Sequence, residues 1–152
     1  MNADRRYRMN GREPQPRSIA MTLAEFSLLV VEDDELTRTM LDLFFRKKGM
    51  KVTLVSGGLE AVRLLQSQSF DLVLTDLFMP GINGNLLLQF IRSLAPQTPV
   101  IAMSSMIEEA DAGFDLRVSK PLEFDRLLPA MAELAENGRM VEPPLRVAGG
   151  GA

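Results

Sequence analysis

The chain has 152 residues, a formal net charge of −3 and an apolar fraction of 46%. This length suits one compact domain with tails, and the apolar fraction is enough for a real core. Neither cysteine nor histidine is present, so disulfides, thiolate or imidazole metal sites, and Ser-His or Cys-His nucleophile pairs are excluded. The chain also cannot itself donate a phosphoryl group from histidine.

The charge is uneven, because residues 1–24 carry five Arg against Asp4 and Glu13. A negative total gives no electrostatic case for nucleic-acid binding, so we expect no direct DNA binding. No apolar run is long enough to span a membrane, and the arginine-rich start is not followed by the apolar region of a secretory signal. We therefore expect a cytoplasmic protein without a membrane contact.

Apolar runs alternate with segments of helical periodicity from about residue 26 to residue 137. In chain order, the pattern predicts a strand at 26–31, a helix at 36–48, a strand at 51–56, a helix at 59–67, a strand at 70–76, a helix at 85–94, a strand at 100–104, a weak helix at 106–112, a strand at 116–119 and a helix at 123–137. Most of the strands are continuously apolar, which is typical of strands covered on both faces. The prediction is an α/β fold, a doubly wound parallel sheet of five strands in one domain over 25–138. Residues 1–24 are expected to be a flexible arm, and residues 139–152 a disordered tail or linker stub.

Polar side chains follow four of these strands at the point where each strand ends. They are Asp33 and Asp34 after the first strand, Asp76 after the third, Ser104 after the fourth and Lys120 after the fifth. In open parallel sheets the ligand crevice lies at the carboxyl ends of the strands. We therefore expect these side chains to converge on one edge of the sheet.

The chemistry of this group points to phosphoryl transfer. Three carboxylates close together repel one another unless a cation joins them. With only oxygen ligands available, Mg²⁺ or Mn²⁺ is favoured over zinc. Lys120 and Ser104 would then hold phosphate oxygens, and Asp76 is the carboxylate placed to act as the nucleophile.

Four motifs in order resemble the receiver domain of two-component response regulators, the CheY-like family, over about residues 26–138. The motifs are "VVEDDE", "DLVLTDLFMPGING", "PVIAMSS" and "VSKP". The resemblance implies a flavodoxin-like (βα)5 fold. It also implies that Asp76 accepts a phosphoryl group from a sensor histidine kinase or a phosphotransfer protein, and that a downstream protein target reads the change.

The resemblance further assigns roles to individual residues. Asp33 and Asp34 would bind Mg²⁺ together with Asp76 and the backbone carbonyl of Phe78. Ser104 would donate a hydrogen bond to the phosphoryl group and Lys120 would pair with it. The peptide bond between Lys120 and Pro121 is cis in this family, a state that is tolerated before proline.

Other interpretations stay open at this point. Asp33 or Asp34 could simply cap the next helix, since Asp is a favoured N-cap residue. The chain could be a degenerate receiver that acts only as a docking module. A phosphatase with an aspartate nucleophile is disfavoured, because such enzymes need a second Asp two residues after the first, to protonate the leaving group, and Phe78 occupies that position.

Three features depart from the family pattern. Arg117 lies three residues before Lys120, where the family usually has an aromatic residue whose ring moves inward. Burying a guanidinium group in an apolar slot would cost much more free energy. Only 15 residues separate Ser104 from Lys120, so the fourth helix is expected to be short or absent. Pro129 lies within the last predicted helix, which it should kink or split. We expect phosphorylation chemistry to be retained and the output surface to be non-standard.

The lifetime of the phosphorylated state can also be predicted. Family members that dephosphorylate fast carry polar groups two residues after the Asp and two after the Ser or Thr. Here those positions are Phe78 and Met106, and neither can orient a water molecule. We therefore expect a signalling phospho-acceptor rather than an enzyme that acts on other substrates. It would catalyse its own phosphorylation and, slowly, its own dephosphorylation.

The segment after Asn137 is too short for an output domain, so the chain is expected to be a stand-alone receiver or a piece of a longer regulator.

Overall fold

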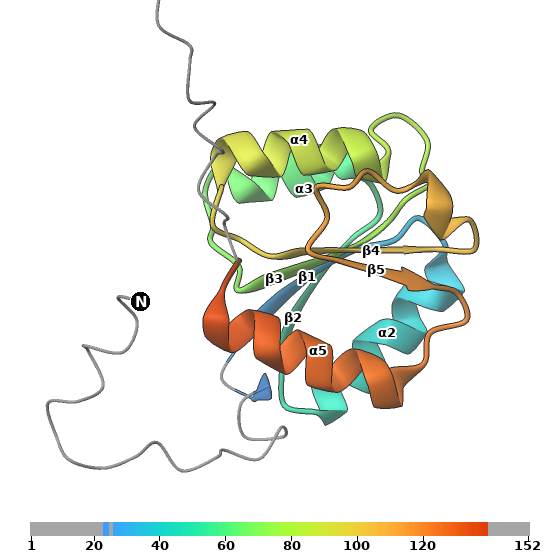
Figure 1. Cartoon of the computed structure of the whole chain (residues 1–152), viewed down its shortest axis with the longest axis vertical. Coiled ribbons are helices and arrows are strands. Elements are labelled where there is room, and N and C mark those ends of the chain that lie inside the picture. The colour runs from blue at the N-terminus through green and yellow to red at the C-terminus, as the bar shows by residue number, and fades with distance from the viewer. Residues whose placement is uncertain (1–22, 25, 140–152) are drawn as a thin grey trace, which may run out of the picture.

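The computed structural model describes residues 23–24 and 26–139 and contains one sheet of five parallel strands (Figure 1). The strands are β1 (Ser27–Val31), β2 (Lys51–Val55), β3 (Leu72–Asp76), β4 (Val100–Ser104) and β5 (Leu116–Ser119). Their order in the sheet is β2-β1-β3-β4-β5, so the order reverses between β1 and β3. The predicted doubly wound parallel sheet is confirmed, and the reversal is the place where such sheets bind ligands.

Helices cover both faces of the sheet because the central strands are apolar on both sides. The helices α2 (Glu35–Lys47) and α5 (Phe124–Asn137) lie on one face, and α3 (Gly58–Leu65) and α4 (Gly84–Leu94) lie on the other (Figure 1). Successive side chains of a strand point to opposite faces. Leu28 of β1 accordingly packs in the core under α2 and α5, and Leu29 packs in the core under α3 and α4.

The predicted shortening of the fourth helix is confirmed. The connection between β4 and β5 contains only η2, a 3₁₀-helix of three residues (Ile107–Glu109). Ala110 and Phe114 from the same connection are buried and fill part of the core beside α4. The connection leaves Arg117 and Ser119 of β5 exposed, which fits their polar character.

The last helix continues through Pro129 without interruption, so the expected split is wrong. Proline removes only one backbone hydrogen bond, and the helix is held by its other face. Leu127 and Met131 are almost fully buried on either side of Pro129. At the start of the helix, Phe124 stacks on Phe44 of α2 with ring centroids 3.8 Å apart.

The predicted arm and tail fall mostly outside the described residues. Of the arm, only Leu23 and Ala24 are described, and Leu23 is buried in the core with 1% of its surface exposed. Of the tail, only Arg139 is described, and its side chain pairs with Asp115. No helix within the described parts is long and apolar enough to cross a membrane.

Candidate functional site

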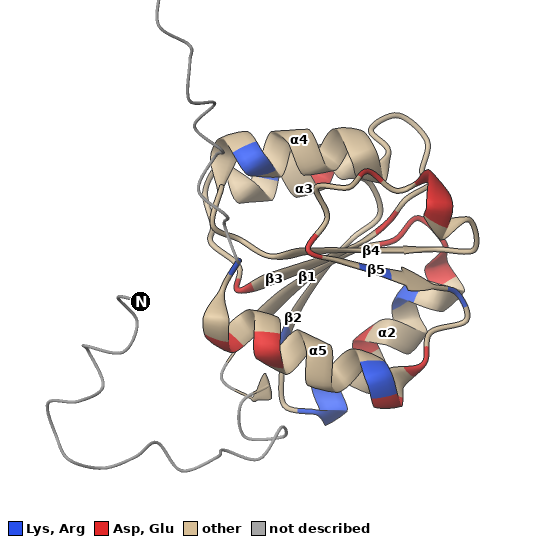
Figure 2. Cartoon of the chain, viewed as in Figure 1, with Lys and Arg blue, Asp and Glu red and all other residues tan. Residues whose placement is uncertain are grey.

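The predicted polar residues lie at the carboxyl ends of the strands, as the sequence indicates. Asp76 is the last residue of β3, and Ser104 is the last residue of β4. Lys120 follows β5 directly, and its backbone N–H donates to the Ser104 carbonyl at 2.9 Å. In Figure 2 the interior strands carry almost no charge, while acidic residues appear in η2 and at the start of α2.

Lys120 joins the carboxylate of Glu32, which directly follows β1, to that of Asp76, which ends β3. Its Nζ lies 3.0 Å from Oε2 of Glu32 and 3.0 Å from Oδ2 of Asp76. Burial alone would lower the pKa of Lys120, but the hydrogen bonds to Asp76 and Glu32 outweigh it and raise that pKa. The ammonium group is therefore firmly charged and held next to the Asp76 carboxylate.

The two carboxylates that Lys120 contacts belong to a cluster of three. Oxygen atoms of Glu32, Asp33 and Asp76 all lie within 4.8 Å of one another. Burial raises the pKa of Glu32, and the negative charge of Asp76 adds to the shift, although the hydrogen bonds from Lys120 and the Asp34 backbone oppose it. A cluster of oxygen ligands that repel one another suits a hard divalent cation, so the group fits Mg²⁺ or Mn²⁺.

Asp34 does not belong to this cluster. Its Oδ2 accepts hydrogen bonds from the Thr37 backbone N–H at 2.9 Å and from the Thr37 hydroxyl at 2.6 Å, so it caps α2. These hydrogen bonds lower the pKa of Asp34. Glu32, and not Asp34, lies in the cluster with Asp33 and Asp76. The signal for the cap was visible in the sequence, because Asp is a favoured N-cap residue and an apolar helical pattern follows it.

Ser104 and Phe78 complete the surroundings of Asp76. Ser104 is buried, and its Oγ accepts a hydrogen bond from the Met106 backbone N–H at 3.0 Å. This bond leaves the hydroxyl proton of Ser104 free to be donated. The Phe78 backbone N–H lies 3.4 Å from Oδ1 of Asp76, and the Phe78 side chain is 49% exposed. A metal contact by the Phe78 carbonyl stays a prediction.

Gly84 has a role at this site that the sequence did not reveal. A Cβ atom at Gly84 would lie 2.6 Å from the carbonyl oxygen of Asp76 and 2.9 Å from Cα of Leu77. The Gly84 N–H also donates to the Leu77 carbonyl at 2.9 Å. The start of α4 therefore packs directly on the backbone that carries Asp76, and only glycine leaves room for this contact. The peptide bond between Lys120 and Pro121 is cis, which confirms the expectation drawn from the resemblance.

Comparison with known proteins decides the family. A sequence profile described as the response regulator receiver domain matches residues 28–132, which is more than half of the chain. The chain belongs to the response regulator receiver domain family. The match includes every strand-end residue discussed above, from Glu32 to Lys120.

Curated relatives of this receiver domain are regulators of greater length. The chain is 37% identical over 125 residues to "Transcription factor SKN7" of Saccharomyces cerevisiae, covering 78% of this chain and 20% of the relative. It is 37% identical over 91 residues to "Regulator of RpoS" of Escherichia coli, covering 60% of this chain and 27% of the relative. It is 35% identical over 124 residues to "Transcriptional activator protein PfeR" of Pseudomonas aeruginosa, covering 78% and 40%. The chain thus spans less than half the length of these relatives.

Solved receiver domains share the fold. The receiver domain of sensor histidine kinase PA1611 from Pseudomonas aeruginosa, with magnesium coordinated in its active-site cleft, superimposes with a TM-score of 0.68 at 27% identity. That comparison covers 73% of this chain and 98% of the other. Response regulator TrrA from Thermotoga maritima, in complex with Mg²⁺ and BeF, gives a TM-score of 0.67 at 27% identity, covering 72% and 98%.

Proposed function

We propose that this receiver domain accepts a phosphoryl group on Asp76 from the phosphohistidine of a sensor histidine kinase or a phosphotransfer protein. The observation that carries the proposal is the environment of Asp76. Its carboxylate lies 3.0 Å from the Lys120 ammonium and within 4.8 Å of the carboxylates of Glu32 and Asp33, at the end of a central strand. A carboxylate beside a fixed cation and a metal-binding pair is suited to attack phosphorus.

Each residue of the site has a distinct role in this proposed reaction. An oxygen of Asp76 attacks the phosphorus, the P–N bond of the donor breaks, and the leaving imidazole takes a proton. Lys120 neutralises charge on a phosphoryl oxygen, and Ser104 donates its hydroxyl proton to another. Glu32, Asp33 and Asp76, with the carbonyl of Phe78, would hold Mg²⁺ or Mn²⁺, which supplies further positive charge.

The surface beside the site supports a protein donor. Leu36, Met40 and Leu43 recur at helical spacing on α2 and are 72%, 57% and 58% exposed. Three large apolar side chains on one exposed helix face are a candidate contact for an apolar surface of a partner. The helix begins at Glu35, two residues after Asp33, so a donor bound there would lie next to the site.

The output of this receiver domain is proposed to be non-standard. Arg117 is exposed on β5, and η2 replaces a full fourth helix. A guanidinium in water cannot reproduce the inward movement of an aromatic ring without losing its hydration. We propose that a downstream protein target reads the phosphorylated state through other contacts.

One experiment tests the proposed function. The purified chain is incubated with acetyl phosphate and MgCl₂ and examined by intact mass spectrometry. We expect one added phosphoryl group, its loss in Asp76→Asn, and its retention in the control Asp42→Asn, a partly exposed residue of α2 outside the acidic cluster. No addition to the unmodified chain would favour a receiver used only for docking. Catalytic turnover of many phosphoesters would favour the phosphatase instead.

A further inference from the structure

The last strand, β5, forms an edge of the sheet, because β4 is its only neighbour among the described strands. The N–H of Lys120, directly after β5, donates to the Ser104 carbonyl at the end of β4 at 2.9 Å. Backbone groups of successive strand residues point to alternate sides, so Leu116 and Val118 also bond toward β4. The residues that alternate with them therefore direct their backbone groups away from the sheet.

The open side of β5 carries the backbone groups of Arg117 and Ser119. Within residues 23–24 and 26–139, no hydrogen bond reaches the N–H or the carbonyl of either residue. Unpaired backbone groups along an edge strand are a template on which another extended chain can pair. Several classes of protein bind partner segments in this way, with side-chain pockets that supply the specificity.

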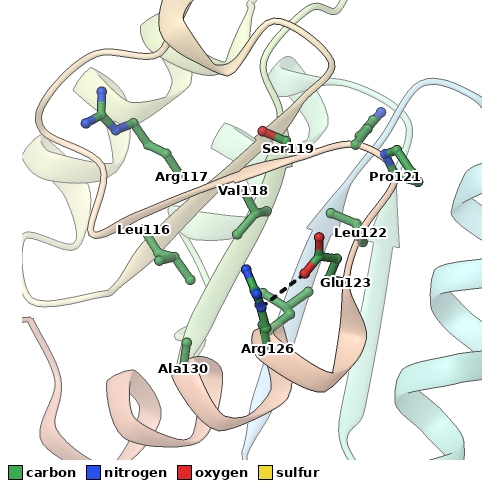
Figure 3. Close-up of a pocket in the computed structure, with 11 residues that line it drawn as sticks. Leu116, Arg117, Val118, Ser119, Pro121, Leu122, Glu123, Arg126 and Ala130 are labelled. Carbon is green, nitrogen blue, oxygen red and sulfur yellow. Dashed lines mark ion pairs between the residues drawn. The ribbon is translucent and has the colours of Figure 1, made fainter.

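A pocket of about 510 Å³ lies along β5, between this strand and α5. In Figure 3, Leu116 and Val118 point from β5 toward α5, and Ala130 lines the pocket from the helix. All three side chains are only partly buried. An added strand would direct every second side chain to this face of the sheet, and apolar residues there would cover the partly exposed side chains of the pocket.

The charged groups of this edge favour an acidic partner. Arg117 is exposed, points away from α5 in Figure 3 and makes no ion pair within the described part of the chain. On the other face, Arg126 is 86% exposed and its pair with Glu123 is 69% exposed at that partner, so the pair is weak. The edge thus presents two arginines against one acidic residue.

We propose that the open edge of β5 binds an extended segment of a partner protein as a sixth strand. The segment has an acidic residue opposite Arg117 and an apolar residue on each side of it, directed into the pocket beside α5. A second copy of this chain fits less well, because pairing β5 with β5 would bring the same basic groups together. The proposal concerns a binding surface and does not depend on phosphorylation of Asp76.

Peptide binding to the full chain tests this proposal. The probe is acetyl-Ser-Thr-Val-Glu-Val-Thr-Ser-amide, which has the expected alternation and is built from residues that favour strands. One comparison peptide has Lys in place of Glu, and a second exchanges each Val with the neighbouring Thr, so that the apolar side chains move to the other face. We expect the probe to bind about threefold more tightly than either comparison peptide in an NMR titration of the isotope-labelled chain.

A charge exchange tests the contact with Arg117. Arg117→Glu should reverse the preference, so that the Lys peptide binds more tightly than the Glu peptide. The control Arg63→Glu makes the same change at an exposed residue of α3, away from the edge, and should keep the original preference. Equal affinities of the Glu and Lys peptides for the unmodified chain would overturn the proposal, as would the absence of binding at millimolar peptide.

Amide hydrogen exchange tests the backbone pairing. Exchange at Arg117 and Ser119 should be fast in the free chain and should slow about tenfold with saturating probe. Leu116 and Val118 are internal controls, because β4 already protects their N–H groups. Unchanged exchange at Arg117 and Ser119 with bound probe would overturn the proposal. Protection that appears without peptide and rises with protein concentration would also overturn it, since a second copy would then be the occupant.

Discussion

At the residue scale, the site combines carboxylates that repel one another with a single ammonium group. Glu32 is buried with 1% of its surface exposed, and its pKa is raised mainly by burial. Lys120 offsets part of this cost by donating to Glu32 and Asp76, but the carboxylates of Glu32, Asp33 and Asp76 still repel one another. A divalent cation would remove this repulsion, so the free energy of unfolding should depend on magnesium.

Substitution of neighbouring acids distinguishes the ligands from the helix cap. MgCl₂ should raise the free energy of unfolding of the unmodified chain by about 2.7 kcal/mol at a concentration 100-fold above Kd. The melting temperature should rise with it. Asp33→Asn should lose most of this effect. Asp34→Asn should keep it, because asparagine also caps α2 and Asp34 lies outside the cluster. Thermal unfolding followed by circular dichroism, with and without MgCl₂, measures the difference. A loss of the magnesium effect in Asp34→Asn as well as in Asp33→Asn would restore the ligand set first suggested by the sequence.

A second prediction at this scale concerns the lifetime of phosphorylated Asp76. Phe78 and Met106 are 49% and 47% exposed, and neither side chain can orient water. Phe78→Asn supplies a polar group at the first position and should speed hydrolysis at least tenfold, which corresponds to about 1.4 kcal/mol of barrier. Loss of the phosphoryl group is followed by intact mass after the phosphodonor is removed. The control Phe90→Asn changes a similarly exposed ring on α4, and a half-life of seconds in the unmodified chain would contradict the prediction.

At the element scale, α5 shows how tertiary contacts outweigh a local sequence signal. Pro129 is exposed in the helix interior, where it lacks the N–H that would bond to the Asp125 carbonyl. The helix nevertheless continues, because Leu127, Met131 and Ala132 are buried against the sheet. The cost of the missing hydrogen bond is therefore still present in the folded protein.

Pro129→Ala should remove this cost. We expect the free energy of unfolding to rise by about 1–2 kcal/mol, since the helix gains a hydrogen bond but the unfolded chain gains conformational freedom. Urea denaturation followed by circular dichroism measures the change. The control Ala135→Gly should lower the stability of the same helix by about 1 kcal/mol. Destabilisation by Pro129→Ala would show that α5 has adapted its backbone to proline.

Most of the site could be predicted from the sequence, because the parallel order of the strands is enough to bring its residues together. Once the strands are parallel, residues that end them must meet at one edge, and this holds for Asp76, Ser104 and Lys120. The choice between Glu32 and Asp34 could not be made in the same way. These acids are separated by one residue, and which of them faces the cluster depends on the backbone angles where β1 ends. The role of Gly84 was hidden for a similar reason, because only the packing of α4 on β3 shows why a side chain is excluded.

At the scale of the whole molecule, one buried carboxylate joins the elements around the shortened connection. Asp115 accepts hydrogen bonds from Arg92 of α4 at 2.8 Å, from the Val100 backbone at the start of β4 at 2.8 Å, and from Arg139 after α5 at 3.1 Å. Its side chain is only 10% exposed. These contacts span 15 to 24 residues in sequence, so no local pattern predicts them. They tie helices from both faces to the edge where the family's full fourth helix is missing.

Removing this carboxylate should therefore weaken the whole fold rather than one helix. Asp115→Ala leaves the Val100 N–H without its acceptor and the partly buried Arg92 without its counter-charge, and we expect a loss of about 3 kcal/mol in the free energy of unfolding. The control Asp42→Ala breaks the Arg46 pair on the surface of α2 and should cost no more than about 0.5 kcal/mol. Urea denaturation at low and at high salt measures both. The loss in Asp115→Ala should persist at high salt, because its partners are mostly shielded from solvent, whereas any loss in Asp42→Ala should fade. Equal costs for the two variants would mean that the elements around η2 are held by apolar packing alone.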